Sequence, residues 1–380
     1  MELYIHIPFC IRKCAYCDFL SAPADAETVA RYMGCLRKQL VRTAASFRGR
    51  RIDTVFIGGG TPSILKAEQL YELLAAVQEN FTTAEGAEIT VEANPGTLAR
   101  AKVEACRAGG VNRVSLGLQS ANDRELRLLG RVHTYRDFLR SYELLREAGI
   151  ANINVDLMSA LPGQTLRSYE KTLQQVLALH PAHISAYSLM IEEGTPFFER
   201  YREDEMLRER GERPRWLPDE ESERAMYELT GALLAAHGYE RYEISNYAKK
   251  GFACRHNMGY WSREEYLGLG LGASSYIEET RFCNTADLGE YLAEDFEPRD
   301  VQQLSRDDCM AEFFYLGLRM SRGVVKSDFV ARFGLRAEQV YGGQLPELIS
   351  AGLLEDDGTC YRLTDYGRDV SNQVLYRFLP

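Results

Sequence analysis

The chain has 380 residues, of which 45% are hydrophobic and 26% charged, and its formal net charge is −10. This size and composition predict a soluble protein with one large α/β domain and a smaller one. The acidic excess argues against a nucleic-acid binder and against a polybasic membrane anchor. The sequence lacks both a membrane-spanning apolar run and the pattern of a signal peptide, so we expect a cytoplasmic protein.

Short β-rich runs alternate with amphipathic stretches from the first residues to about residue 240. The strands are predicted at 3–7, 54–57, 88–92, 113–118, 152–157 and 183–189. The helices are predicted near 27–46, 66–80, 97–108, 135–148, 167–179 and 219–237. Six strand–helix units in series imply a parallel sheet, and their regular spacing predicts an α/β fold of the partial (β/α)6 TIM-like barrel type. Such a barrel leaves one side open to a large substrate.

The predicted barrel occupies residues 1–240 and is followed by two further segments. Within it, residues 199–218 are so charged that we expect a solvated excursion between the sixth strand and its helix. Residues 241–304 are glycine-rich and are predicted to be irregular. Residues 305–380 predict helices, a small hairpin and a final helix, as in a winged-helix-like α+β domain. The near balance of charge in this last part favours an accessory role over DNA binding.

The first predicted strand runs into PFCIRKCAYCDF, which places Cys10, Cys14 and Cys17 at CxxxCxxC spacing. In a reducing compartment, clustered cysteines are more often ligands or catalysts than disulfides. A fourth thiolate is absent from the next expected position, which is Phe19. Three thiolates on a cubane iron–sulfur cluster would leave one iron open to another ligand. The amine and carboxylate of a methionine attached to adenosine could chelate that iron.

Each of the later predicted strands also ends in a chemically distinctive group. These groups are the turn Gly58-Gly59-Gly60-Thr61-Pro62, Glu92, Gln119, Asp156 and the pair Met190 and Glu192. Because the carboxyl ends of parallel strands meet at one mouth, we expect the groups to line one site. Each alone is equally compatible with a tight turn, a cap or a surface carboxylate, and the cysteines alone with zinc or a redox pair. The series as a whole favours a binding site.

These motifs resemble those of the radical S-adenosylmethionine (SAM) superfamily. The segments YIHIPFCIRKCAYCDF, FIGGGTPS, VEANPGT, SLGLQS and VDLMSALPGQT, in that order, resemble the oxygen-independent coproporphyrinogen III oxidase group, which includes the HemW-type haem chaperones. The resemblance covers essentially the whole chain. It implies a [4Fe-4S] cluster held by Cys10, Cys14 and Cys17.

The resemblance also implies a SAM site around the cluster. Tyr4, Gly59 and Glu92 match positions that contact the SAM bound to the cluster, and Glu92 suits its cationic amine. In the oxidase, a second SAM is held by residues that match Tyr16, Gly60, Thr61, Gln119, Arg131 and Asp156. Arg131 can pair with a carboxylate in bidentate fashion, and Asp156 can accept from a ribose or an amine. For a chaperone, the resemblance leaves open whether this second SAM binds.

Two features separate the chaperones from the oxidase. The oxidase motif is CxxxCxxCxC, whereas this chain has Phe19 at the last position. The segment CRHNMGYW matches the HNxxYW motif of HemW-type proteins, which is implicated in haem binding, so residues 241–304 become the expected haem- or substrate-binding segment. This match implies that His256 is the axial ligand of the haem iron, with Cys254 as the alternative. It implies that Asn257 orients the haem ring or a propionate, and that Tyr260 and Trp261 provide a flat apolar surface for the porphyrin. Without the motif, a histidine beside aromatic rings is more often a packing residue.

The leading hypothesis is a haem chaperone that transfers haem to acceptor haemoproteins and retains the cluster and the SAM site. The alternative is an oxygen-independent coproporphyrinogen III oxidase, which forms protoporphyrinogen IX by radical decarboxylation; we do not expect this activity. A zinc-dependent redox protein would explain the cysteines but not the glycine and carboxylate positions. We expect no nucleic-acid partner. The acceptor, its association with membranes and a homodimer stay open.

Overall fold

The computed structural model describes residues 1–379, and a twelve-stranded sheet dominates its larger part. The strand order is β12-β11-β10-β9-β1-β2-β3-β4-β5-β6-β8-β7. Its centre consists of six parallel strands in chain order, which are β1 (Glu2–Ile7), β2 (Arg51–Gly59), β3 (Thr82–Ala93), β4 (Arg113–Gln119), β5 (Asn152–Ser159) and β6 (His183–Ser188). The predicted α/β class with a parallel partial barrel is confirmed.

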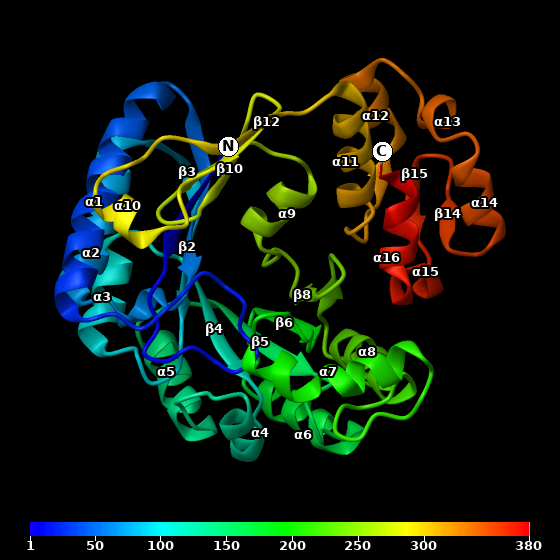
Figure 1. The fold of residues 1–380 in the computed structure, drawn as a ribbon, viewed down its shortest axis with the longest axis horizontal. Coiled ribbons are helices and arrows are strands. Elements are labelled where there is room, and N and C mark those ends of the chain that lie inside the picture. Colours follow the sequence, from blue (N-terminus) through cyan, green and yellow to red (C-terminus); the bar gives the residue numbers. More distant parts are fainter. Residues whose placement is uncertain (380) are drawn as a thin grey trace.

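Helices cover the outside of this curved sheet, as α1, α2, α3 and α5 show in Figure 1. The six crossover helices are α1 (Ala26–Ala44), α2 (Ala67–Asn80), α3 (Arg100–Ala108), α5 (Tyr135–Glu147), α6 (Leu166–Leu177) and α8 (Glu220–Ala236). A short α4 (Asp123–Leu128) precedes α5. Sequence fixes these helices locally: in α5, for example, the Thr134 hydroxyl accepts from the Asp137 amide, and Phe138 and Leu145 are buried against the sheet.

The charge-rich segment 199–218 is more ordered than expected. Its first half belongs to α7 (Pro196–Glu209), and its second half folds around the buried carboxylate of Asp204. Asp204 accepts hydrogen bonds from the backbone amides of Arg215, Trp216 and Leu217, at 3.1, 2.6 and 2.8 Å. One buried acidic residue therefore organises a turn that the charge pattern alone predicted to be solvated.

The segment 241–304, which we expected to be irregular, supplies strands at both edges of the sheet. The strands are β7 (Glu240–Arg241), β8 (Asn246–Ala248), β9 (Tyr266–Leu269), β10 (Ser274–Ile277), β11 (Thr280–Cys283) and β12 (Arg299–Gln303). β8 pairs antiparallel with β6, whereas β9 pairs parallel with β1 at the opposite edge. Such short strands take their register from an existing sheet edge rather than from a periodicity of their own, so sequence alone did not reveal them. The segment also holds α9 (Arg255–Trp261) and α10 (Leu288–Leu292).

The C-terminal part forms a smaller α+β domain with its own core, drawn in orange and red in Figure 1. Its three-stranded antiparallel sheet has the order β13-β15-β14, from β13 (Val324–Val325), β14 (Leu354–Asp356) and β15 (Cys360–Leu363). Its helices are α11 (Arg306–Gly317), α12 (Lys326–Phe333), α13 (Ala337–Val340), α14 (Gln344–Ser350), α15 (Asp365–Asp369) and α16 (Ser371–Leu375). The expected second domain is confirmed. Across residues 1–379, no helix has the length and apolar character needed to cross a membrane.

Gly268 tests whether β9 and β10 are integral to the sheet. A Cβ at Gly268 would lie 2.1 Å from the backbone oxygen of Ser274, which cannot move without separating the two strands. We expect Gly268→Ala to lower the free energy of unfolding by about 1–3 kcal/mol, as measured by urea denaturation. Gly34→Ala is the control, because no heavy atom lies within 4 Å of its added Cβ and it sits in α1. An equal effect of the two substitutions would contradict this packing.

Candidate functional site

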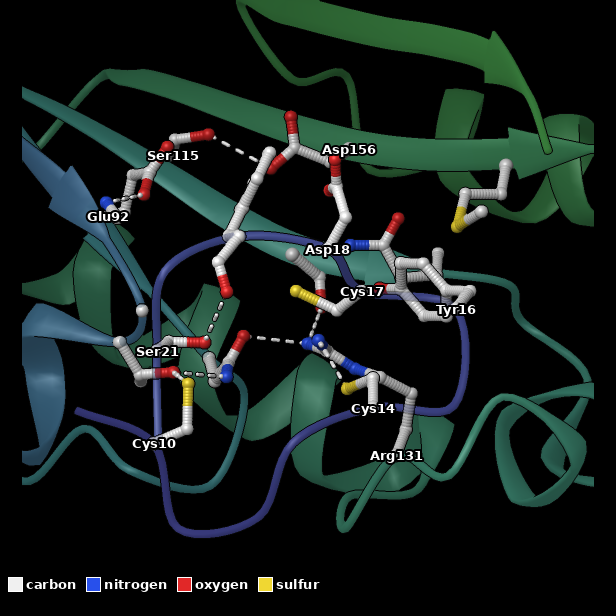
Figure 2. A pocket seen from close by; sticks show the side chains of 18 of the residues that line it. Cys10, Cys14, Tyr16, Cys17, Asp18, Ser21, Glu92, Ser115, Arg131 and Asp156 are labelled. Atoms are coloured by element: carbon white, nitrogen blue, oxygen red, sulfur yellow. Dashed lines mark hydrogen bonds between the residues drawn. The ribbon is translucent and has the colours of Figure 1, made fainter. Parts of the chain in front are cut away.

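The loop between β1 and α1 carries the three cysteines to the carboxyl edge of the parallel strands. Cys10, Cys14 and Cys17 line a cavity of about 510 Å³ together with residues from the carboxyl halves of the other five central strands and from loops that follow some of them. The loop is anchored at two points, because the Cys10 amide donates to the Ala22 carbonyl at 3.1 Å and the Ala15 amide donates to the Leu129 carbonyl at 3.0 Å. Figure 2 shows the three sulfur atoms around this cavity.

The structure brings most of the predicted SAM residues into the wall of the same cavity. Those that line it are Tyr16, Gly59, Gly60, Thr61, Glu92, Gln119, Arg131 and Asp156. Tyr4 is not among the lining residues, and its hydroxyl instead forms a hydrogen bond with Nδ1 of His6 at 2.9 Å. The expected convergence of strand ends is therefore found, whereas the part that each residue takes in SAM binding stays a prediction.

The glycine turn after β2 lies directly against the base of the cysteine loop. A Cβ at Gly60 would come within 2.7 Å of the Phe9 oxygen, and one at Gly59, whose φ is 107°, within 2.4 Å of the His6 ring. The amides of Gly60 and Thr61 donate to the carbonyls of Ile7 and Phe9, each at 2.8 Å. Only glycine allows this approach, which explains the GGGT sequence without reference to any ligand.

Two carboxylates reach the cavity from neighbouring parts of the sheet. Oε2 of Glu92 accepts from the Gly59 amide at 3.0 Å, and burial together with the nearby Asp156 raises the Glu92 pKa to about 8. Asp156 accepts from the Ser115 hydroxyl at 2.9 Å and from Nδ2 of Asn154 at 2.6 Å, and Figure 2 shows the contact with Ser115. Acceptors of this kind suit a ligand that carries an amine or a ribose.

Several residues of the site were missed by the sequence analysis. Ser115 and Tyr187 line the cavity, and Asn154 supports it from behind. The available signal was a polar residue at an inward-facing position of a buried strand, as for Ser115 on β4 and Asn154 on β5. Tyr187 carried no such signal, because its role depends on a neighbour that is distant in sequence.

Tyr187 and Gln119 form the wall where β4 ends. The Tyr187 hydroxyl donates to Oε1 of Gln119 at 3.0 Å, and the backbone of Gln119 has a φ of 72°. A left-handed conformation is uncommon for a residue with a side chain and is held here by the surrounding structure. It turns the chain out of the sheet at the cavity.

The donor set fits a cluster with three thiolate ligands. The three cysteines are free thiols and face one cavity, so no disulfide competes for them. Within residues 1–379, no three His, Cys, Asp or Glu side chains already surround a position for a single metal ion. A cubane cluster does not require such a position, since it spreads its ligands over separate irons. When bound, this group would supply one-electron transfer and one iron that a ligand with two donor groups can chelate.

The CRHNMGYW motif lies elsewhere, at the amino ends of the central strands. It forms α9, whose His256 is 1% exposed, with Nδ1 at 2.7 Å from Oγ1 of Thr54 and Nε2 at 2.9 Å from the Tyr260 hydroxyl. Burial and the charge of Arg113 lower the His256 pKa to about 3, so the ring is neutral. In this conformation both ring nitrogens have hydrogen-bond partners, and an iron ligated by His256 would have to displace one of them.

The neighbours of His256 are equally engaged. Glu88 accepts from the amides of Arg255 and His256 at 3.1 and 3.2 Å, and the buried Cys254 thiol lies 3.5 Å from Oε1 of Glu88. Trp261 instead stacks with the Arg319 guanidinium, 4.3 Å from its ring centre, on the side of the C-terminal domain. Asn257 forms part of the same helix and is partly exposed. The structure therefore does not bring the predicted haem residues to the cysteine cavity.

Comparison with known proteins defines the class to which this fold and cavity belong. The family model of the radical SAM superfamily matches residues 4–176, and that of the HemN C-terminal domain matches residues 304–370. The solved structure of coproporphyrinogen III oxidase (HemN) from Escherichia coli, described as a radical SAM enzyme, has a TM-score of 0.86 and 25% sequence identity, covering 99% of this chain and 89% of that one. The molecule is a radical SAM protein with a HemN-like fold.

Curated relatives narrow the assignment within that class. The protein named Heme chaperone HemW from Bacillus subtilis (strain 168) is 37% identical, covering 99% of this chain and 98% of the relative. The protein of the same name from Lactococcus lactis is 38% identical, covering 99% and 96%, and that from Escherichia coli (strain K12) is 36% identical, covering 100% and 98%. The chain belongs to the HemW family. The resemblance inferred from its motifs is confirmed.

Glu92 predicts a pH dependence of stability. The folded chain keeps this proton up to about pH 8, whereas an ordinary glutamic acid releases it near 4.5, so between these values the folded state binds more protons than the unfolded state. The free energy of unfolding therefore falls as pH rises through this window, and we expect Glu92→Gln to flatten the fall. Urea denaturation between about pH 5 and pH 8 measures it.

The matched control for this series is Glu79→Gln on the exposed face of α2, which should follow the parent protein at every pH. A Glu92→Gln profile that runs parallel to that of the parent protein would contradict the shifted pKa.

Proposed function

We propose that this protein is a cytoplasmic haem chaperone, which binds haem and transfers it to acceptor haemoproteins while carrying a [4Fe-4S] cluster and SAM. The observation that carries the proposal is the similarity over nearly the whole chain to proteins named Heme chaperone HemW. Phe19 supports it, because the oxidase motif has a cysteine at this position. All nine cysteines are free thiols, as expected in a reducing compartment.

In this proposal Cys10, Cys14 and Cys17 hold the cluster, and the adjoining cavity holds SAM. Glu92 accepts from the amine of SAM, and ionises when that positive charge arrives beside it. Arg131 and Asp156, which both line the cavity, are suited to a carboxylate and to a ribose or amine, respectively.

The haem is proposed to bind at α9, with His256 as its iron ligand. The neutral state of the buried ring supports this, because a neutral imidazole is the form that coordinates iron. Binding then requires α9 to leave its seat on the strand ends far enough to release Nε2 from Tyr260. Tyr260 and Trp261 are the adjacent aromatic rings that could cover the porphyrin once α9 has moved.

Haem titration of two α9 variants tests this proposal. We expect His256→Ala to lose the Soret shift seen with the parent protein. Tyr260→Phe keeps the ligand and removes the bond that holds Nε2, so it should bind haem faster, by roughly fivefold for the loss of one hydrogen bond. Stopped-flow absorbance measures both. An unchanged spectrum in His256→Ala would assign the iron ligand to another residue.

The oxidase alternative has support of its own, since the HemN structure superposes on the whole chain. A turnover assay separates the two functions. We expect the anaerobically reconstituted protein, supplied with reductant and SAM, to leave coproporphyrinogen III unconverted, as followed by porphyrin fluorescence after oxidation. Many turnovers per chain would favour the oxidase, whatever haem the protein also binds.

A further inference from the structure

A connected set of hydrogen bonds links two of the three cysteines across the cavity floor. Sγ of Cys10 lies 3.3 Å from Oγ1 of Thr61, which in turn accepts from Nδ2 of Asn94 at 2.8 Å. On the other side, Nη2 of Arg131 donates to Oδ1 of Asn94 at 2.6 Å, and Nη1 of Arg131 donates to Sγ of Cys14 at 3.7 Å. Figure 2 shows Cys10 and Cys14 on the same side of the cavity, with Arg131 beside Cys14. The Asn94 side chain is the point where the two halves meet.

Asn94 is itself held in place by its backbone. It follows β3 directly, and its amide donates to the Ser63 hydroxyl at 3.1 Å. Its carbonyl accepts from the amide and the hydroxyl of Thr97, at 3.1 and 2.7 Å. The residue after it is proline, which restricts its conformation further. The side-chain amide therefore projects from a fixed position.

Both ends of the Asn94 amide are needed at this position. Its nitrogen donates toward Thr61 and its oxygen accepts from Arg131, so the two partners require opposite hydrogen-bonding roles. Arg131 is also held by the Gly117 carbonyl at 2.6 Å, which fixes the plane of its guanidinium. An aspartate could accept from Arg131 but could not donate to Thr61 when ionised. An alanine could do neither.

We propose that Asn94 is a positioning residue for the cluster, which orients the thiols of Cys10 and Cys14 through Thr61 and Arg131. The inference rests on the proposed cluster, and it concerns only how the chain prepares two of its ligands. A loop whose ligands are already oriented loses less freedom on binding the cluster, and groups that hydrogen-bond to ligand sulfurs tune the bound metal. Cys17 lies outside this set of bonds.

The test measures cluster retention rather than activity. Parent protein, Asn94→Ala, Asn94→Asp and Thr61→Val are reconstituted anaerobically, and iron content, the rate of iron release to a chelator and the midpoint potential are measured. We expect Asn94→Ala and Thr61→Val to release iron roughly fivefold to tenfold faster, the size of one lost buried hydrogen bond. Asn94→Asp should lie between them and the parent. A variant that combines Asn94→Ala with Thr61→Val should release iron no faster than the faster of the two single variants, because both substitutions break the same series of hydrogen bonds.

Asn112→Ala provides the matched control. The Asn112 side chain also joins two backbone groups, because it accepts from the Ile89 amide at 2.9 Å and donates to the Ala87 carbonyl at 2.7 Å. It lies just before β4, at the end of the β3–β4 pair that is far from the cysteines. It should lower thermal stability and leave iron release unchanged. If Asn94→Ala, Asn94→Asp and Thr61→Val all release iron at the rate of the parent protein and keep its midpoint potential, the inference is overturned and the proposed cluster still stands. A parent protein that takes up no iron would overturn the proposed cluster itself.

Discussion

The site depends on the close contact between the glycine turn after β2 and the base of the cysteine loop. At Gly60 the two backbones are so near that a single methyl group would collide with the Phe9 carbonyl. The amides of Gly60 and Thr61 bond to the strand end that precedes the cysteines. The cysteine loop has little regular secondary structure of its own. This contact therefore positions the thiols of Cys10, Cys14 and Cys17 relative to Glu92 and to the ends of the other central strands.

A chain of hydrogen-bonded polar side chains runs through the interior of the barrel. Asn154 bonds to Asp156 at the cavity and also to His183, whose other nitrogen meets the Tyr242 hydroxyl. That hydroxyl accepts from the amide of Cys254, where α9 begins. Such a core is costly unless its groups are paired, and it specifies one arrangement when they are. The same fold thus has a cavity at the carboxyl ends of the strands and the packed helix α9 at their amino ends.

The HemN-like fold by itself does not decide the function. The HemN structure and this chain share their architecture at 25% identity, and one scaffold can carry different activities. The two sequence features that favour the chaperone lie at the rim of the cavity and at α9. Phe19, which is 61% exposed, occupies the position at which the oxidase motif has a cysteine. Both ring nitrogens of His256 form hydrogen bonds, one with Thr54 and one with Tyr260. Function in this family is therefore argued from these positions rather than from the barrel.

From the residues alone we could predict the six strands, their helices and the convergence of Cys10, Glu92 and Asp156 at one edge of the sheet. Hydrophobic periodicity is a local property, and parallel pairing brings the strand ends together. The order of the motifs also indicated the family. The folded chain was needed to show that Asn94 links Cys10 to Cys14, that residues 241–304 supply strands at both sheet edges and that α9 lies away from the cysteines. Each of these depends on partners far apart in sequence, whose contacts arise when the sheet curves and closes. No local pattern encodes such contacts.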